Sequence, residues 1–459
     1  MMGICGVGMA SLAGLLKNKG FLITGSDQNV YPPMSHYLRD LSISVKSGYR
    51  VENLIPRPDL VIVGNVITRS NPEALELCKS GIPYLSMPQA LREFALKGRK
   101  SLLVCGTHGK TTTSGLAAWV LEQAGTDPGF MVGGIPHNFG RNFKEGRGDY
   151  YVVEGDEYDT AFFDKGPKFL HYEPWGTILT SIEYDHADIY KDVGQVIESF
   201  RKLMAILPPD GFLIVNGDDP VALDESRRAQ CPAVSYGFGD GVDWRAGKII
   251  NGEPFTRIEV VGKTGESFEI RTQLYGRHNV SNLLAAFALA EMLGLERALV
   301  LDGMRTFKGI KRRQEVIGEK RGILVLDDFA HHPTAVEETI GAVKERYERR
   351  RLVAVFEPRS NSSRRSVFQA EYASCFDRAD AVFIPEPPLM ETIPPDERFS
   401  SRRLVEDLTD RGLNALYCPD TDHLLGELLQ EVKEGDVILI MSNGSFDNLP
   451  QRLMKNLES

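Results

Sequence analysis

Short apolar runs alternate with longer amphipathic stretches along most of the chain. The apolar runs at Ser101–Val104, Leu352–Phe356 and Val437–Met441 predict buried strands. Amphipathic stretches such as Gly115–Gln123 carry apolar residues at helical spacing and predict helices that follow those strands. Regular alternation of strand and helix is typical of α/β domains built on parallel sheets. We therefore expect an α/β protein.

The alternation falls into three blocks, which predict three domains at residues 1–98, 99–312 and 313–459. The first and third are expected to be Rossmann-like, and the middle one a parallel-sheet domain of the kind found in P-loop ATPases. The elements predicted for the first block are strands Phe21–Thr24 and Leu60–Val63 and helices Met9–Lys19 and Pro72–Ser80.

The middle block is expected to contain a β-rich passage, residues 233–275, and then a helix, Val280–Leu293, with Asn279 as its N-cap. Lys308–Arg313 is the predicted linker to the third block. The remaining strands predicted for the two blocks are Tyr150–Val153, Thr177–Ile182, Phe212–Val215, Ile323–Leu326 and Ala381–Ile384.

The composition of the chain limits the partners and the cell compartment that we expect. The 459 residues carry a net charge of −10, which argues against nucleic acid or an anionic membrane as the main partner. The six cysteines are scattered without a CxxC motif, so we expect reduced thiols and a cytoplasmic protein.

The first residues contain a glycine turn, Gly3-x-x-Gly6-x-Gly8, without the strand that normally precedes such a turn. We therefore expect the natural chain to start upstream of Met1. The segment lacks the basic residues of a signal peptide.

The decapeptide CGTHGKTTTS, residues 105–114, lies between a predicted strand and a predicted helix. In such loops backbone N–H groups and the helix N-terminus bind nucleotide phosphates, a lysine reaches the terminal phosphates, and a hydroxyl binds Mg²⁺. Lys110 and Thr111 occupy those two positions, which predicts ATP or GTP binding. The strict motif has glycine where this chain has Val104. The alternative is a simple glycine turn with a solvated lysine.

Acidic residues follow two strands predicted in the middle block, in VVEGDEYD (152–159) and IEYDHAD (182–188). Ligands of parallel sheets bind beyond the carboxyl ends of the strands, so Glu154 and His186 should converge on Lys110 and Thr111. Carboxylate, hydroxyl and neutral imidazole groups suit a site with bound metal ions. The alternatives are an acid at a helix N-terminus for Glu154 and an ordinary loop histidine for His186.

Six motifs together resemble the Mur ligase family, the ATP-dependent amide-forming enzymes of peptidoglycan metabolism. The resemblance spans the whole chain, with the motifs in the family's order and approximate spacing. They are GTHGKTTT, EGDEYD, EYDHAD, GRHNVSNLLAA (276–286), RRQE (312–315) and DDFAHHPT (327–334). The resemblance implies ATP and Mg²⁺ as cofactors and an acyl phosphate intermediate. It therefore implies no nucleophilic side chain.

The resemblance also assigns roles residue by residue. The catalytic set is Lys110, Glu154, His186 and Arg313, and the metal ligands are Thr111, Glu154 and His186. The phosphates would be held by Gly106, Thr107, His108, Gly109, Lys110, Thr111 and Thr112. His278, Asn279 and Asn282 match the motif that lies against adenine, and Arg313 and Asp328 match residues that close the third domain over ATP. Some relatives carry a carbamylated lysine, but we interpret Lys202 as an ordinary helical lysine.

Three further segments indicate which substrates of the family this chain uses. GSDQNVYPPMS (25–35), FEPRSNSS (356–363) and MSNGSFDNL (441–449) resemble family members that join UDP-N-acetylmuramate to L-alanyl-γ-D-glutamyl-meso-diaminopimelate in peptidoglycan recycling. The expected partners are thus these two small molecules. The predicted substrate-binding residues are Gly6, Gly8, Ser26, Asp27, His137 and Asn138 for the donor and Arg359, Ser360 and Asn361 for the peptide, with Asn29, Tyr31 and Ser35 as further donor candidates.

Three other functions stay open at this point. One is the family member that adds L-alanine to the same donor. The second is an NAD-dependent oxidoreductase, suggested by the first block, which leaves Lys110, Thr111, Glu154 and His186 unexplained. The third is a nucleotide-gated binding protein without ligase activity, against which the full set of metal and phosphate residues argues.

Overall fold

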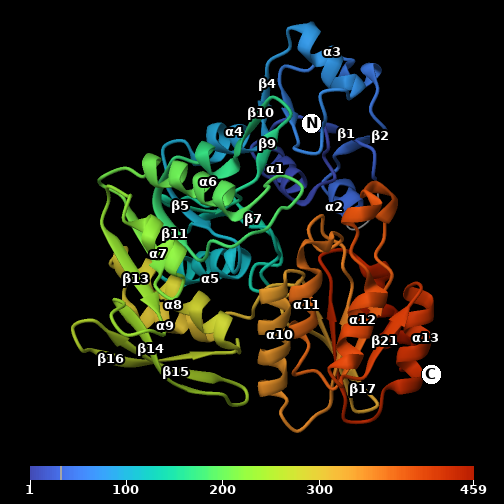
Figure 1. The fold of residues 1–459 in the computed structure, drawn as a ribbon. Helices are drawn as coiled ribbons and strands as arrows, with labels where there is room; N and C mark the ends of the chain where they lie inside the picture. The colour runs from blue at the N-terminus through green and yellow to red at the C-terminus, as the bar shows by residue number, and fades with distance from the viewer. Residues whose placement is uncertain (31–33, 459) are drawn as a thin grey trace.

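The computed structural model describes residues 1–30 and 34–458 and consists of three α/β units. In Figure 1 the first unit is blue, the central unit runs from cyan to yellow, and the third is orange to red. The predicted fold class, three α/β domains with a large parallel-dominated central sheet, is confirmed. No helix among the described residues is long and apolar enough to cross a membrane.

The first unit is a small parallel sheet in which Met2 occupies the middle position. Met2 forms a parallel bridge to Ser26 on one side and to Val63 on the other. The strands are β1 (Thr24–Asp27), β2 (Ser44–Ser47), β3 (Val61–Val63) and β4 (Tyr84–Ser86), and the helices are α1 (Val7–Asn18), α2 (Met34–Asp40), α3 (Pro72–Ser80) and α4 (Met87–Leu91). The predicted strand Phe21–Thr24 is wrong, because the strand begins at Thr24 and Leu22, 88% exposed, lies outside the sheet.

The central unit has a ten-stranded sheet in the order β16-β15-β14-β13-β12-β11-β5-β8-β6-β7. The strands from β14 to β6 run parallel, and β7, β15 and β16 pair antiparallel at the edges. The strands are β5 (Lys100–Cys105), β6 (Gly129–Met131), β7 (Phe143–Lys144), β8 (Tyr150–Gly155), β11 (Pro174–Leu179), β12 (Phe212–Asn216), β13 (Ala233–Gly237), β14 (Trp244–Ile250), β15 (Thr256–Gly262) and β16 (Ser267–Thr272); β9 (Asp159–Ala161) and β10 (Asp164–Pro167) form a separate hairpin.

Helices cover both faces of this sheet. The helices are α5 (Lys110–Gln123), α6 (Val193–Ile206), α7 (Pro220–Ser226), α8 (Arg277–Met292) and α9 (Arg297–Thr306). Apolar residues of α5, α8 and α9 form the core on one face. On the other face α6 packs together with α1 and α4 of the first unit, so the two units share one continuous core.

Two predicted boundaries in the central unit are wrong for local reasons. The strand predicted as Thr177–Ile182 ends at Leu179, because the Thr180 hydroxyl donates to the carbonyl of His108 and turns the chain toward the phosphate loop. The helix predicted to start after Asn279 starts at Arg277, because Gly276, with φ 89°, is its N-cap.

The third unit is a six-stranded sheet in the order β17-β18-β22-β19-β20-β21, parallel except for β17. Its strands are β17 (Glu315–Lys320), β18 (Ile323–Asp328), β19 (Leu352–Phe356), β20 (Ala381–Pro385), β21 (Ala415–Cys418) and β22 (Val437–Met441), and its helices are α10 (Pro333–Arg346), α11 (Gln369–Cys375), α12 (Ser401–Asp410), α13 (Thr421–Glu431) and α14 (Leu449–Asn456). Loops after β18 and β19 hydrogen-bond to residues 184–188, which follow β11 of the central unit. The carboxyl ends of strands from both sheets therefore meet at one interface.

Candidate active site

The phosphate loop runs from the end of β5 to the start of α5. At two of its positions the backbone conformation and the neighbouring atoms require glycine. Gly106 has φ 125°, and a Cβ there would lie 2.2 Å from Oγ1 of Thr180. Gly109 has φ 80°, and its Cβ would lie 2.5 Å from Oδ1 of Asn282. Other side chains are both strained and obstructed at such positions. The loop is therefore shaped by close packing against Thr180, which follows β11, and against Asn282 of α8, and it leads directly into the N-terminus of α5.

Lys110 is held in place by two acceptors inside the protein. Its Nζ donates to the carbonyl of Gly106 at 2.5 Å and to Oε2 of Glu157 at 3.1 Å. Burial alone would lower the pKa of Lys110, but Glu157 and Asp156 raise it well above its ordinary value. Lys110 is thus a permanent cation next to the loop.

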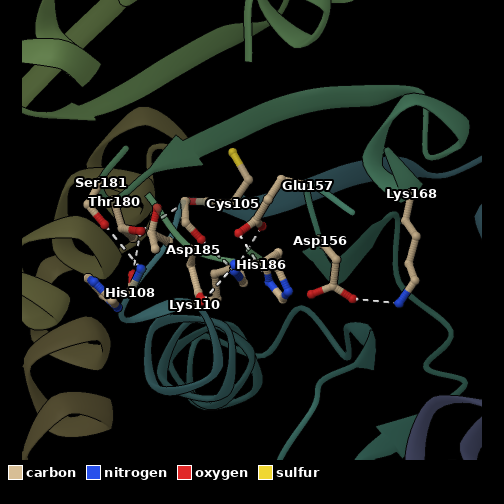
Figure 2. A network of polar contacts seen from close by, with 12 residues as sticks. Cys105, His108, Lys110, Asp156, Glu157, Lys168, Thr180, Ser181, Asp185 and His186 are labelled. Carbon is tan, nitrogen blue, oxygen red and sulfur yellow. Dashed lines mark hydrogen bonds and ion pairs between the residues drawn. The ribbon is translucent and has the colours of Figure 1, made fainter. Parts of the chain in front are cut away.

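Glu157 also faces His186, as Figure 2 shows. Its Oε1 lies 3.7 Å from Nε2 of His186, and its side chain is only 2% exposed. The sequence prediction missed this residue, although EGDEYD contains it, because a run of acids after a strand does not reveal which one points inward. Glu157 connects Lys110 and His186, two of the residues predicted to be catalytic.

Glu154 lies at the end of β8 and is the residue best suited to hold a cation. Its Oε2 accepts from the backbone N–H of Gly133, while its buried Oε1 has no hydrogen-bond partner among the described residues. Burial and the neighbouring Asp156 raise the pKa of Glu154. An unpartnered carboxylate oxygen close to the Thr111 side chain, which also faces Gly133, fits the oxygen ligands that Mg²⁺ prefers.

The residues predicted to lie against adenine lie at the start of α8. The Asn279 amide donates to the carbonyl of Tyr275 and to Oε1 of Gln314, and Asn282 accepts from the Thr113 hydroxyl. Burial, reinforced by Arg313, lowers the pKa of His278 to about 4, so its imidazole is neutral near pH 7. Nδ1 of this ring is buried without a hydrogen-bond partner among the described residues.

Arg313 and Asp328 lie where the linker enters the third unit. The carboxylate of Asp328 accepts from the backbone N–H groups of Gln314 and Ala330, each at 2.7 Å. Burial lowers the pKa of Arg313, while the charges of Asp328 and Glu154 raise it. The structure therefore brings Arg313 into the electrostatic environment of Glu154.

Arg359, Ser360 and Asn361 line a cavity of about 330 Å³ between the central and third units. Nη1 of Arg359 donates to Oε1 of the buried Glu357, and the Asn361 amide donates to Oδ2 of Asp188. The rest of the lining is Asp185, His186, Asp188, His331, Ser362 and Asn443. This cavity thus places the residues predicted for the peptide beside His186.

Asp185, which was not among the predicted site residues, lines this cavity and connects the central unit to the third unit. Its Oδ1 accepts from the Ser362 hydroxyl at 2.8 Å, and both groups are buried. Burial would raise the pKa of Asp185, but His186, His331 and His332 lower it well below its ordinary value. It is therefore an anion at the interface.

The residues predicted for the donor lie in two places. Gly6 is the N-cap of α1, Gly8 lies in its first turn, and Asp27 accepts from the N–H of Cys5 in the glycine turn. The Ser26 hydroxyl donates to Glu73 inside the first unit. Tyr31, within the YPP segment, lies outside the described residues.

His137 and Asn138 lie against the linker. The amide of Asn138 donates to the carbonyl of Thr306 and its carbonyl accepts from the N–H of Lys308. Nε2 of His137 lies 3.5 Å from Oε1 of Glu315. The side chain of Asn138 therefore hydrogen-bonds to the backbone at the start of the linker. Lys202 is exposed on α6, as expected for an ordinary helical lysine.

Comparison with known protein families matches all three units. The Mur ligase family, catalytic domain, matches residues 1–99, the Mur ligase middle domain matches residues 104–290, and the Mur ligase, glutamate ligase domain, matches residues 312–444.

Several characterised proteins are similar over the full chain. UDP-N-acetylmuramate–L-alanyl-γ-D-glutamyl-meso-2,6-diaminoheptandioate ligase of Escherichia coli K12 is 39% identical over 100% of this chain and 97% of its own. UDP-N-acetylmuramate–L-alanine ligase of Carboxydothermus hydrogenoformans is 32% identical over 98% of this chain and 95% of its own.

Solved structures agree in fold. A murein peptide ligase from Psychrobacter arcticus is 33% identical over 99% of this chain and 98% of its own, with a TM-score of 0.75. The UDP-N-acetylmuramate–alanine ligase of Thermotoga maritima superposes with a TM-score of 0.82 over 100% of this chain and 98% of its own. At 24% identity this second likeness shows the fold alone.

Proposed function

The chain belongs to the Mur ligase family, and from that premise we propose that it joins UDP-N-acetylmuramate to L-alanyl-γ-D-glutamyl-meso-diaminopimelate at the expense of ATP. The observation that carries the proposal is the full-length identity of 39% to the Escherichia coli ligase named for these substrates, against 32% for the L-alanine ligase of Carboxydothermus hydrogenoformans. The arginine-containing cavity at the interface supports a peptide acceptor with several carboxylates.

In the proposed reaction the muramate carboxylate attacks the γ-phosphorus of ATP and forms an acyl phosphate with release of ADP. The peptide amine then attacks the acyl carbon, and the tetrahedral intermediate expels phosphate to leave an amide. Neither step needs a nucleophilic side chain, because phosphoryl transfer depends mainly on positioning and on neutralising charge. Residues of the interface would perform these tasks.

Lys110 and the N-terminus of α5 would hold the phosphates, and Arg313 would bring a second cation from the linker. Glu154 and Thr111 would hold Mg²⁺, with His186 as a further ligand held by Glu157. Mg²⁺, when bound, supplies charge neutralisation at the phosphate oxygens. His278, neutral near pH 7, suits contact with an uncharged adenine ring.

Arg359 would bind a carboxylate of the peptide, for which a planar guanidinium is suited. The donor would lie along the glycine turn and α1 of the first unit, with its diphosphate at the helix N-terminus. We also propose a cytoplasmic location, which is supported by six free cysteines within the described residues.

Oxygen transfer tests the proposed reaction directly. The donor is prepared with ¹⁸O in its muramate carboxylate, and the product phosphate is analysed by mass spectrometry after reaction with the tripeptide. One ¹⁸O atom per phosphate is expected, because the acyl phosphate oxygen leaves with phosphorus. Amide formation with unlabelled phosphate would contradict the proposed intermediate.

A further inference from the structure

Three potential metal ligands from two units lie together beside the phosphate loop. Nε2 of His108 is 3.3 Å from Oε2 of Glu183, and the same oxygen is 3.9 Å from Nδ1 of His332. The three ligand atoms lie within 4.8 Å of one another. His108 and Glu183 belong to the central unit, and His332 is the N-cap of α10 in the third unit.

The backbone of both ligands from the central unit is held by a network of hydrogen bonds. The N–H of Glu183 donates to Oγ1 of Thr107 at 2.8 Å, and that hydroxyl donates to the carbonyl of Glu183 at 3.2 Å. The N–H of His108 donates to the Ser181 hydroxyl at 3.1 Å. The side chain of Glu183 is positioned separately, because its Oε2 accepts from the Thr334 hydroxyl at 2.8 Å.

The hydrogen bonds of His332 leave Nδ1 as the nitrogen that faces the cluster. Its Nε2 lies 3.1 Å from the carbonyl of Tyr184, so the proton belongs on Nε2 and the lone pair on Nδ1. Metal-binding histidines commonly donate their other ring N–H to a carbonyl in this manner. Burial, reinforced by His108, lowers the pKa of His332 to about 4, which keeps the ring neutral. Among the described residues, Nδ1 accepts a single hydrogen bond, from the N–H of Thr334 at 3.3 Å, and a bound ion would replace it.

The donor atoms indicate the class of ion. Two imidazoles and one carboxylate suit Zn²⁺ and similar transition metals, whereas Mg²⁺ prefers oxygen ligands. Tetrahedral bonds of about 2.0–2.1 Å place neighbouring ligand atoms about 3.4 Å apart. Two of the three observed separations, 3.3 and 3.9 Å, are close to that value, and the third is within 4.8 Å. His108 and Glu183 are partly exposed, which leaves a route for solvent and a fourth ligand.

We propose that His108, Glu183 and His332 form a binding site for a divalent transition metal ion of the Zn²⁺ class, which links the phosphate loop to the third unit. This site differs in residues and in chemistry from the predicted Mg²⁺ ligands Thr111, Glu154 and His186. An ion bound there would restrain movement of α10 relative to the loop. Turnover of a ligase whose units must open and close would then slow when the ion binds.

Calorimetric titration of the full-length protein with Zn²⁺ tests the site. The protein is first freed of metal with a chelator, and millimolar Mg²⁺ is kept present to occupy oxygen sites. The variant His332→Asn removes the imidazole but retains a side chain that can cap α10. Glu183→Gln is the second variant. The control is His423→Asn, which alters an exposed histidine paired with Asp420 on α13.

One Zn²⁺ per chain is expected for the unaltered protein and for His423→Asn. His332→Asn and Glu183→Gln should each weaken binding by at least about tenfold, because each removes a ligand. Co²⁺ bound in place of Zn²⁺ should give the intense visible absorption of four- or five-coordinate sites, and His332→Asn should abolish it. Equal Zn²⁺ affinity in all four proteins, or no saturable binding at all, would overturn the proposal.

Discussion

Nζ of Lys110 lies 3.1 Å from Oε2 of Glu157, and the other oxygen of that carboxylate lies 3.7 Å from His186. One buried acid therefore positions both the cation expected at the ATP phosphates and an expected metal ligand. Its negative charge also raises the pKa of Lys110. Glu157 is accordingly the residue through which phosphate binding and metal binding can be disturbed together.

The change Glu157→Gln removes this charge while keeping the shape of the side chain. We expect kcat to fall by about 10²-fold, because Lys110 and His186 lose their shared anchor, with little change in the KM of the peptide. Steady-state phosphate release measures both constants. Glu225→Gln is the matched control, since Glu225 is equally buried and pairs with Arg201 and Arg228 away from the site. A kcat within about twofold of the unaltered enzyme would remove Glu157 from the site.

The change Gly109→Ala tests the shape of the phosphate loop. The added Cβ would lie 2.5 Å from Oδ1 of Asn282 at φ 80°, so we expect a lower Tm and ATP binding weakened by at least about tenfold. Thermal unfolding and equilibrium nucleotide binding measure the two effects. In Gly426→Ala, in α13, the added Cβ meets no atom of the described residues within 4 Å, and this change should instead stabilise the folded protein by about 0.5–1 kcal/mol. Unchanged ATP affinity in Gly109→Ala would contradict the role of the loop.

The change Arg359→Ala tests the peptide site. Loss of a guanidinium that binds a carboxylate should raise the KM of the tripeptide by about 10–100-fold and leave that of UDP-N-acetylmuramate unchanged. Arg411→Ala serves as the control, because Arg411 pairs with Asp377 elsewhere on the third unit. An unaltered tripeptide KM, or an equal rise for both substrates, would show that Arg359 does not bind the peptide.

His278 should make the protein less stable in acid. Its pKa is about 4 in the folded chain, compared with an ordinary value of 6.5, so the unfolded chain binds more protons between these values. Stability is therefore lost as pH falls from 6.5 toward 4, by an amount on the order of 2 kcal/mol at pH 5. Tm measured against pH should fall less steeply in His278→Gln than in the unaltered protein. The same slope in both would contradict a His278 imidazole that stays neutral in the folded chain, and His423→Gln, altered at an exposed site, should not reduce the slope.

Continuous apolar runs were the most dependable guide to the fold. Leu352–Phe356 and Val437–Met441 are strands with the predicted bounds, because a fully buried parallel strand needs apolar residues on both faces. The strand predicted to begin at Phe21 was wrong, because an apolar residue beside a glycine can equally lie in an exposed connection. The N-cap prediction at Asn279 was also wrong, because a glycine with positive φ starts the helix three residues earlier than an asparagine N-cap would allow.

The candidate site was predictable where a residue type is tied to a motif, as for Lys110 and Thr111. Glu157, Asp185 and Glu183 could not be chosen from the neighbouring acids in the same motifs, because their importance comes from partners far away in sequence. Glu183 meets Thr334 and His332 only when the third unit packs against the central one. Contacts of this kind depend on how domains pack, which no local pattern encodes.

The most direct test of the proposed function compares two acceptors in one assay. Purified enzyme is given ATP, Mg²⁺ and UDP-N-acetylmuramate with either the tripeptide or L-alanine, and kcat/KM for phosphate release is measured for each acceptor. We expect turnover with L-alanyl-γ-D-glutamyl-meso-diaminopimelate to exceed turnover with L-alanine by at least about a hundredfold, because the interface cavity and Arg359 favour an acceptor with several carboxylates. Equal or greater kcat/KM with L-alanine would contradict the account and identify an L-alanine-adding ligase instead.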